Sequence, residues 1–545
     1  MIQSHAMRLA HLICCLASAA AVVKAAAIYP PVIHFDVADQ RPLEAHQPYT
    51  DSRKPAPAPA HSASSWRPYP QDDRTCTANA THFTGRVPVT PEKRLFFWFV
   101  ESRRDPLRDP TILWLNGGPA GSSMPGLFQE IGPCELLSNG TGFETSNRNW
   151  DGKGNSSSVT VVNPDSWANF ANVLILDQPA GTGMSTAEGD SSPTTLAAAS
   201  VDFSVFLSEF VARFPQYFDS GFYVAGESFG GRYVPRYVAD IVSAQQQQQQ
   251  RTQKEKRQGK IINNDEDDDD DSNAALPVKI DGIILVDAYI DGISRVLGYY
   301  EMFCTDEYQD RLRFNETACS SIAAATPRAE YLLNVCQETY EFQDCLAAVL
   351  YASANIEIYF QEVIETGKYS PYDLRLPCDL PNLSCIPPNE FYSETHLNRP
   401  EVQKLLGFDP PHRYRAVNMS LNFAWAGQPE MQIPTTRNVS WLLDEGDVRI
   451  LVFNGDYDGV ITTPGMFREF DNLPWSQNEV FRKQPKVGWR WVNADGESAK
   501  GGKIKGVPKL VAASVYDAGH MSPGDAKPAV ASLVRSWIKQ KGFFF

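Results

Sequence analysis

A serine stands between two glycines in the segment Gly226-Glu227-Ser228-Phe229-Gly230. This segment matches the G-x-S-x-G pattern, in which a sharp strand-to-helix turn lifts a nucleophilic serine above a sheet. The glycines permit the cramped turn, which a side chain at either position would obstruct. The apolar run 222–225 predicts a strand before the turn, and a helix is predicted over 232–242, restarting at Pro235. The segment therefore predicts serine hydrolase chemistry with Ser228 as the nucleophile.

A serine hydroxyl is a weak nucleophile and needs a histidine base that a carboxylate orients. On this type of scaffold the three residues follow one another in the order serine, acid, histidine. Asp458 follows the apolar run 449–453, and His520 follows the run 510–515. Asp456 is an alternative acid, but we favour Asp458 because the later position in this turn usually faces the histidine. The chain thus supplies all three members of a catalytic triad.

The strands that must carry these residues are predicted from short apolar runs. Six such runs lie at 95–100, 111–115, 173–176, 282–286, 449–453 and 510–515. Helical patterns separate several of them, and the aromatic series from Phe203 to Phe214 predicts a helix that packs in the core. Alternating strands and helices predict a mainly parallel α/β sheet, which binds ligands beyond the carboxyl ends of its strands. Because polar or glycine-rich turns follow the strand runs, we expect the candidate chemistry at one sheet edge.

The chain divides into two core parts, a cap and two low-complexity segments. We expect core parts over 76–292 and 399–545, and a helical, disulfide-braced cap over 293–398, which is rich in helix formers and cysteines. Residues 245–275 contain a glutamine run, a basic patch and an acidic run, and are expected to form a solvated loop. Residues 28–75 are rich in proline and show no sustained apolar period, so they predict a pro-segment or a flexible arm.

The amino terminus predicts a signal peptide over 1–27. Arg8 precedes the apolar stretch 9–23, which ends in small residues and falls short of the roughly 20 apolar residues that span a bilayer. We therefore expect a secretory protein, extracellular or vacuolar, with no membrane association after signal removal. Seven N-x-S/T sequons fit this compartment and predict N-linked glycans, at Asn79, Asn139, Asn155, Asn315, Asn382, Asn418 and Asn438.

The composition narrows the class of protein further. A chain of 545 residues that is 43% hydrophobic can form a large core with an inserted subdomain. The net charge of −16 and the lack of a basic stripe argue against a nucleic-acid partner. Eight of the ten cysteines remain after signal removal, and without metal-binding C-x-x-C spacing they suggest disulfides.

Five motifs together resemble the serine carboxypeptidase family, particularly its fungal members. The motifs are Leu95-Phe96-Phe97-Trp98-Phe99-Val100-Glu101-Ser102-Arg103, Trp114-Leu115-Asn116-Gly117-Gly118-Pro119, Leu176-Asp177-Gln178-Pro179-Ala180-Gly181-Thr182-Gly183, Gly226-Glu227-Ser228-Phe229-Gly230-Gly231-Arg232-Tyr233-Val234-Pro235 and Ala518-Gly519-His520-Met521. The resemblance implies the α/β-hydrolase fold, with a central mostly parallel sheet and an inserted helical cap. It also implies a serine-type carboxypeptidase that cleaves the C-terminal peptide bond of peptides and proteins through an acyl-enzyme, favours acid pH and needs no cofactor or metal. An acyltransferase on the same scaffold and a nonenzymatic binding or protective protein are the alternatives.

The resemblance assigns roles to eight residues. Ser228, Asp458 and His520 would form the triad, the backbone N–H groups of Gly118 and Phe229 the oxyanion hole, and Asn116, the Gly117 backbone and Glu227 the site for the substrate carboxylate. An ionised Glu227 would repel that carboxylate by ~4 kcal/mol at ~4 Å and an effective dielectric constant near 20. One of the two groups must therefore hold a proton, which predicts tighter binding at low pH.

The chain also departs from the family pattern at two places. This chain has Gly118-Pro119-Ala120-Gly121-Ser122-Ser123 where the family commonly has Gly-Pro-Gly followed by a cysteine or serine, so the loop geometry is in question and one family disulfide is missing. Asp287 follows the run 282–286 where family members often have asparagine, and it either favours a basic residue on the acyl side of the cut or forms local hydrogen bonds. The resemblance then implies disulfides between Cys304 and Cys319, Cys336 and Cys345, Cys378 and Cys385, and Cys76 and Cys134.

Overall fold

The computed structural model describes residues 66–137, 160–257, 276, 278–308, 312–378, 385, 392–493 and 495–540. The predicted signal peptide and most of the predicted proline-rich arm lie outside the described residues. The same holds for the sequons at Asn139, Asn155 and Asn382, and for the acidic run that follows residue 260.

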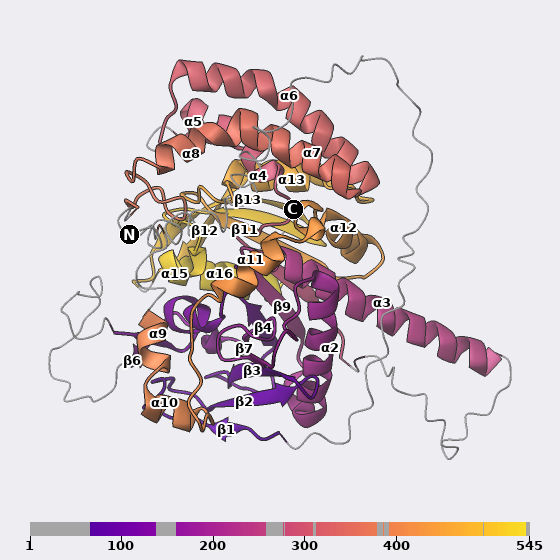
Figure 1. Cartoon of the computed structure of the whole chain (residues 1–545), viewed down its shortest axis with the longest axis vertical. Coiled ribbons are helices and arrows are strands. Elements are labelled where there is room, and N and C mark those ends of the chain that lie inside the picture. Colours follow the sequence, from indigo (N-terminus) through magenta and orange to yellow (C-terminus); the bar gives the residue numbers. More distant parts are fainter. Residues whose placement is uncertain are drawn as a thin grey trace.

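One mixed sheet forms the centre of the molecule (Figure 1). Its strands follow the spatial order β1 (Tyr69–Pro70), β2 (His82–Pro88), β3 (Lys93–Val100), β7 (Asn172–Leu176), β4 (Thr111–Leu115), β9 (Phe222–Glu227), β10 (Gly282–Val286), β11 (Arg449–Gly455), β14 (Leu510–Val515), β13 (Ser498–Val507) and β12 (Val487–Val492). The six strands from β7 to β14 are parallel to one another, and β8 (Thr186–Ala187) pairs with β3. The predicted mostly parallel sheet and its six strand runs are confirmed. A separate pair joins β5 (Cys134–Leu136) to β6 (Thr160–Val162).

Helices cover both faces of this sheet, as its strand sequences require. Within β10, Ile283 and Leu285 enter one apolar cluster, whereas Ile284 and Val286 enter a second cluster on the opposite face. Helix α2 (Leu196–Arg213) packs into the first cluster through its aromatic series, which confirms the predicted core helix. The other helices outside the cap are α3 (Gly230–Arg257), α9 (Tyr392–Leu397), α10 (Pro400–Leu405), α11 (Met419–Ala426), α12 (Thr436–Asp444), α13 (Thr463–Asp471), α14 (Asn478–Arg482), α15 (Ser522–Asp525) and α16 (Lys527–Ile538).

Helix α3 is longer than the sequence predicted, and the expected loop over 245–257 is wrong. The helix continues to Arg257 because glutamine, lysine and arginine are all good helix formers. It also passes through Pro235 without a restart, although a proline offers no N–H to the carbonyl four residues earlier. That carbonyl belongs to Gly231, and it accepts a hydrogen bond of 3.0 Å from the Thr435 hydroxyl instead.

The cap has its own apolar cluster and most of the disulfides. Its helices are α4 (Ser294–Leu297), α5 (Tyr299–Cys304), α6 (Glu316–Thr339), α7 (Phe342–Ala352) and α8 (Ile358–Ile364). No side chain of their cluster, which runs from Ile293 to Cys385, belongs to the two clusters beside the sheet. Helix α9 lies beside α10 at the other end of the molecule, and Leu397 packs into a sheet cluster (Figure 1). The apolar packing of the cap thus ends before α9.

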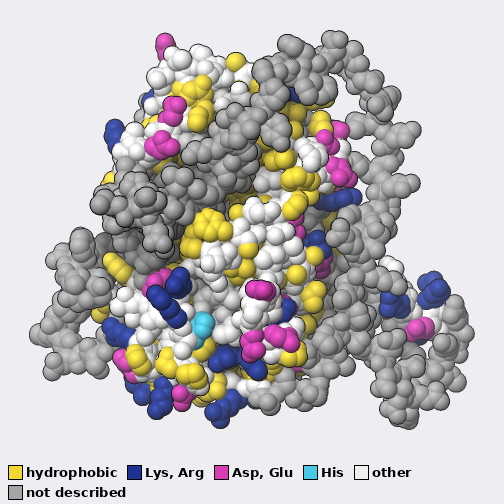
Figure 2. Space-filling model, in the orientation of Figure 1, with side chains coloured by type: hydrophobic (Ala, Val, Ile, Leu, Met, Phe, Trp, Pro, Cys, Tyr) yellow, Lys and Arg dark blue, Asp and Glu magenta, His cyan; other side chains and the backbone are white. Residues whose placement is uncertain are grey.

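All four implied disulfides are present, and three of them brace the cap. These join Cys304 to Cys319, Cys336 to Cys345 and Cys378 to Cys385, whereas Cys76–Cys134 ties the chain before β2 to β5. None of the helices in the described part of the chain is long and apolar enough to cross a bilayer. On the face drawn in Figure 2, basic and acidic side chains are interspersed.

Candidate active site

Ser228 occupies the sharp turn between β9 and α3. Its φ of 56° lies in the left-handed region, a strained conformation that only its surroundings can enforce. A Cβ built on Gly226 would lie 2.6 Å from the Val234 side chain, so this position requires glycine. Ser228 is partly exposed, whereas Glu227 and Phe229 on either side are buried. The turn therefore presents the serine hydroxyl at the carboxyl end of β9.

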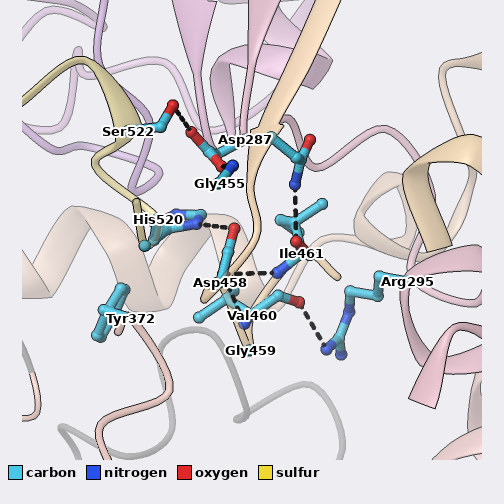
Figure 3. A network of polar contacts seen from close by, with 12 residues as sticks. Asp287, Arg295, Tyr372, Gly455, Asp458, Gly459, Val460, Ile461, His520 and Ser522 are labelled. Atoms are coloured by element: carbon cyan, nitrogen blue, oxygen red, sulfur yellow. Dashed lines mark hydrogen bonds and ion pairs between the residues drawn. The ribbon is translucent and has the colours of Figure 1, made fainter. Parts of the chain in front are cut away.

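The predicted acid and histidine meet at the same edge of the sheet. Strands β9, β10, β11 and β14 are parallel neighbours in that order, so the turns that follow them lie side by side. The Asp458 carboxylate lies 2.7 Å from Nδ1 of His520 (Figure 3). Its other oxygen accepts hydrogen bonds from the backbone N–H groups of Val460 (2.7 Å) and Ile461 (3.0 Å). Asp458 rather than Asp456 is therefore the partner of His520.

The electrostatics of this pair follow from its complete burial. Burial raises the pKa of Asp458, and the charge and hydrogen bond of His520 act in the opposite direction. On the other side of the ring, Nε2 of His520 is buried and has no hydrogen-bond partner among the described residues. The structure thus fixes one ring nitrogen and leaves the other available, and no hydrogen bond joins His520 to Ser228 within the described part.

The glycine turn after β4 lies against the serine turn. A Cβ built on Gly117 would lie 2.3 Å from the backbone nitrogen of Phe229 and 2.9 Å from Cβ of Ser228. Gly118 has a φ of 116°, which favours glycine there. Within the described residues, neither the Gly118 nor the Phe229 N–H group donates a hydrogen bond. These two donors are therefore available to a developing negative charge.

A second group of acids lies directly beside the serine. Nδ2 of Asn116 donates to Oε1 of Glu227 (2.9 Å) and to Oε1 of Glu130 (3.3 Å). Oδ1 of Asn116 accepts from the Trp114 indole (2.7 Å), which fixes the orientation of the amide. Glu130 and Glu227 are both buried and hydrogen-bonded to each other. Two carboxyl groups in such contact must share a proton, because like charges this close cannot both ionise.

Glu130 is a site residue that the sequence patterns missed. It ends the π-helical turn η1 (Gly126–Glu130), whose other side chains are apolar or small apart from Gln129. Burial raises the pKa of Glu130, and the hydrogen bonds with Glu227 and Asn116 oppose this rise. The sequence signal that could have identified Glu130 is a single acid among the apolar residues Leu127, Phe128 and Ile131. Burial of a charge is costly unless the charge is paired, so such an acid is expected to have a specific partner.

Asp287 is fully buried, which favours the local hydrogen-bonding alternative over the expected preference for basic residues. The side chain is completely buried behind the triad, where one oxygen accepts from the Gly455 N–H (2.7 Å) and the other from the Ser522 hydroxyl (Figure 3). Burial, and secondarily the charge of Asp458, hold the pKa of Asp287 well above its usual range. The alternative of local hydrogen bonding is confirmed.

Ala120 adopts a backbone conformation that favours glycine. Its φ of 61° is unfavourable for a residue with a Cβ, and contacts from outside the loop hold it in place. Its N–H donates to the Tyr233 hydroxyl (3.3 Å), and its carbonyl accepts from the Asn418 N–H (3.0 Å). These two hydrogen bonds hold the loop in this conformation.

The comparisons with known proteins agree with this geometry. The profile of the serine carboxypeptidase family matches residues 70–540, which is most of the chain. The chain belongs to the serine carboxypeptidase family. Carboxypeptidase Y of Saccharomyces cerevisiae is 30% identical over 465 residues, which cover 84% of this chain and 76% of that protein. Carboxypeptidase Y homolog A of Phaeosphaeria nodorum is 28% identical over 447 residues, which cover 82% and 71%.

A solved structure shows the same fold. The prohormone-processing carboxypeptidase Kex1 from Saccharomyces cerevisiae aligns with 87% of this chain and 96% of its own, at a TM-score of 0.65 and 20% identity. The chain described here therefore has the α/β-hydrolase fold with a helical cap, as the sequence motifs implied. It is a serine-type carboxypeptidase, and the predicted enzyme class is confirmed.

Proposed function

We propose that this carboxypeptidase cleaves the last peptide bond of peptides and proteins through an acyl-enzyme on Ser228. The observation that carries the proposal is the group of Asn116, Glu130 and Glu227, which places a proton-sharing acid pair next to the nucleophile. Such a pair donates a hydrogen bond to an incoming carboxylate while its proton is present. It would therefore select substrates by their free C-terminus.

The chemistry follows from the contacts of the triad. As Oγ of Ser228 bonds to the scissile carbonyl carbon, Nε2 of His520 takes its proton and later gives it to the departing amine. Water then attacks the ester, His520 accepts a proton from the water, and Ser228 regains that proton as the acyl C–O bond breaks. Asp458 holds Nδ1 of His520, which keeps Nε2 free to act as the base. The N–H groups of Gly118 and Phe229 would bind the oxyanion.

The acid pair also gives a reason for activity at acid pH. Below the raised pKa of Glu130 the pair keeps its shared proton and attracts the substrate carboxylate. Above that pKa the proton is lost, and two negative groups then repel the substrate. We expect KM to rise with pH for this reason.

We also propose that the protein is a secreted or vacuolar glycoprotein. Among the sequons in the described residues, Asn79 and Asn315 are exposed and can carry a glycan. Asn418 differs, because its Nδ2 donates to the Gly181 carbonyl (2.8 Å) and its Oδ1 caps α11. A glycan on Nδ2 would displace the contact with Gly181, so we expect glycans on Asn79 and Asn315 and none on Asn418.

A peptide-ladder experiment tests the proposed activity directly. Time-resolved mass spectrometry of one peptide at pH 5 and pH 7 should show loss of single residues from the C-terminus, faster at the lower pH. The same peptide with a C-terminal amide should be cut much more slowly, and Ser228→Ala should abolish both reactions. Loss of residues from the amino end, or transfer of the acyl group to an added alcohol in preference to water, would overturn the proposal.

A further inference from the structure

A segment of the cap crosses the two loops that carry Asp458 and His520. We call residues 370–376, which follow α8, the strap. The strap accepts a hydrogen bond at the Pro371 carbonyl from the Gly459 N–H (2.9 Å), and the N–H of Leu374 donates to the Tyr457 carbonyl (3.0 Å). These two contacts flank Asp458 on both sides.

The strap makes an equally direct contact with the histidine loop. The backbone N–H of His520 donates to the Tyr372 carbonyl at 2.6 Å, and the Tyr372 ring lies beside the imidazole (Figure 3). A Cβ built on Gly519 would lie 2.4 Å from that carbonyl, so the two backbones touch without an intervening side chain. One segment of the cap therefore holds both members of the Asp458–His520 pair.

Arg375 joins the strap to both loops through its side chain. Nη1 donates to the Asp517 carbonyl (2.6 Å), and Nη2 donates to the Asp525 carboxylate (3.1 Å). The same Asp525 oxygen accepts the Gly519 N–H at 2.7 Å, one residue before His520. The guanidinium also lies 5.0 Å from the centre of the Tyr457 ring, next to Asp458.

The guanidinium is itself held in a fixed position. Its Nε and Nη2 donate to the two oxygens of Asp373 (2.8 and 2.6 Å), which is a bidentate pair within the strap. The Ser370 hydroxyl donates to the Cys385 carbonyl (2.6 Å), and Cys385 is bonded to Cys378. The start of the strap is therefore tied to the disulfide loop that follows the strap. The contacts to the catalytic loops thus start from a pre-organised segment. A lysine could not reproduce them, since it lacks the planar fork of donors.

We propose that Arg375 is a positioning residue, which fixes the His520 loop against the Asp458 loop through the strap. The inference rests on the proposed roles of Asp458 and His520. Arg375 touches neither reacting atoms nor the carboxylate site in the structure, so its loss should change the alignment of the triad rather than the binding of substrate. A misplacement of about 1 Å in a catalytic group can cost about 10²-fold in rate.

The test compares Arg375→Gln with Arg468→Gln as a matched control. Arg468 also links the cap to the core, through ion pairs from α13 to Glu301 and Glu330, but it contacts neither catalytic loop. We expect Arg375→Gln to lower kcat by about 10- to 100-fold with KM within about threefold of wild type. The rate at which a fluorophosphonate labels Ser228 should fall by the same factor, because labelling depends on the triad and not on the carboxylate site. Arg468→Gln should keep the wild-type kcat and labelling rate.

Two further measurements separate positioning from a loss of folding. Arg375→Lys keeps the charge but not the fork, so its kcat should lie between those of wild type and Arg375→Gln. Added guanidinium ion at millimolar concentration should restore part of the kcat of Arg375→Ala. Wild-type kcat in Arg375→Gln or Arg375→Lys, or an equal loss of kcat in Arg468→Gln, would overturn the inference. The proposed function would survive that outcome, since it fails only if wild type lacks carboxypeptidase activity or Ser228→Ala retains it.

Discussion

The site around Ser228 contains the single acid Asp458 and the acid pair Glu130–Glu227, and the hydrogen-bond partners of the two differ. Asp458 faces an imidazole and two backbone N–H groups, all of which favour its ionised form. Burial raises the pKa of both Asp458 and Glu130, but Glu130 and Glu227 face each other and a single amide. The same functional group is thus prepared for two opposite tasks. In the proposed mechanism, one side orients a base by its charge, and the other recognises a carboxylate by its proton.

We expect the largest loss of kcat when the charge of Asp458 is removed. Asp458→Asn should lower kcat by about 10⁴-fold, because an amide favours the wrong tautomer of His520. KM should change little, since Asp458 does not contact Glu130 or Glu227. Steady-state kinetics on a blocked dipeptide measure both constants. Asp456→Asn is the matched control, and a comparable loss of kcat in that variant would contradict the assignment of the acid.

Gly117 lies against the backbone of Glu227 and Phe229 and against Cβ of Ser228, so Gly117→Ala should damage the serine turn that lies between the two sides. The new Cβ would lie 2.3 Å from the Phe229 nitrogen, and the turn must shift away from the serine. We expect kcat to fall by about 10²- to 10³-fold, as for the loss of an oxyanion donor. Gly427→Ala is a suitable control, because the nearest atom to its new Cβ would be 3.7 Å away. Retention of more than a tenth of kcat would show that Gly117 is not needed at this contact.

Glu227→Gln should change binding and its pH dependence rather than the chemical step. At acid pH we expect kcat/KM to fall about tenfold, since one hydrogen bond to a charged group is weakened. Toward neutral pH the decline of kcat/KM should be shallower than in wild type, because the amide carries no proton to lose. The measurement is kcat/KM from pH 4 to pH 8, and Glu130→Gln should change the profile in the same direction. An unchanged profile in both variants would exclude the acid pair from substrate recognition.

Asp287→Asn should have the smallest effect, although Asp287 is buried behind the triad. Both of its oxygens already accept local hydrogen bonds, and its raised pKa means that little charge is removed by the substitution. The ratio of kcat/KM for matched Lys and Leu substrates should stay within about twofold of wild type. A larger shift toward Leu would mean that the Asp287 charge reaches the substrate.

The sequence predicted those parts of the site that follow strands. Ser228, Asp458 and His520 each come directly after an apolar run, and parallel neighbours bring such positions together without further information. Glu130 and Arg375 were not predicted, because their partners come from segments that lie far away in the sequence and carry no periodic pattern. Glu130 contacts Glu227 only after η1 folds back over β4. Arg375 contacts Asp525, which lies 150 residues later in the sequence.

The separate apolar cluster of the cap has a consequence for the evolution of this enzyme. Substitutions among its side chains leave the packing on either face of the sheet intact, because no member is shared. Its three short-range disulfides preserve the local chain path while side chains are exchanged. Selection can therefore diversify the cap helices in descendants of this protein, whereas the strap must stay nearly constant for the catalytic loops to remain in register.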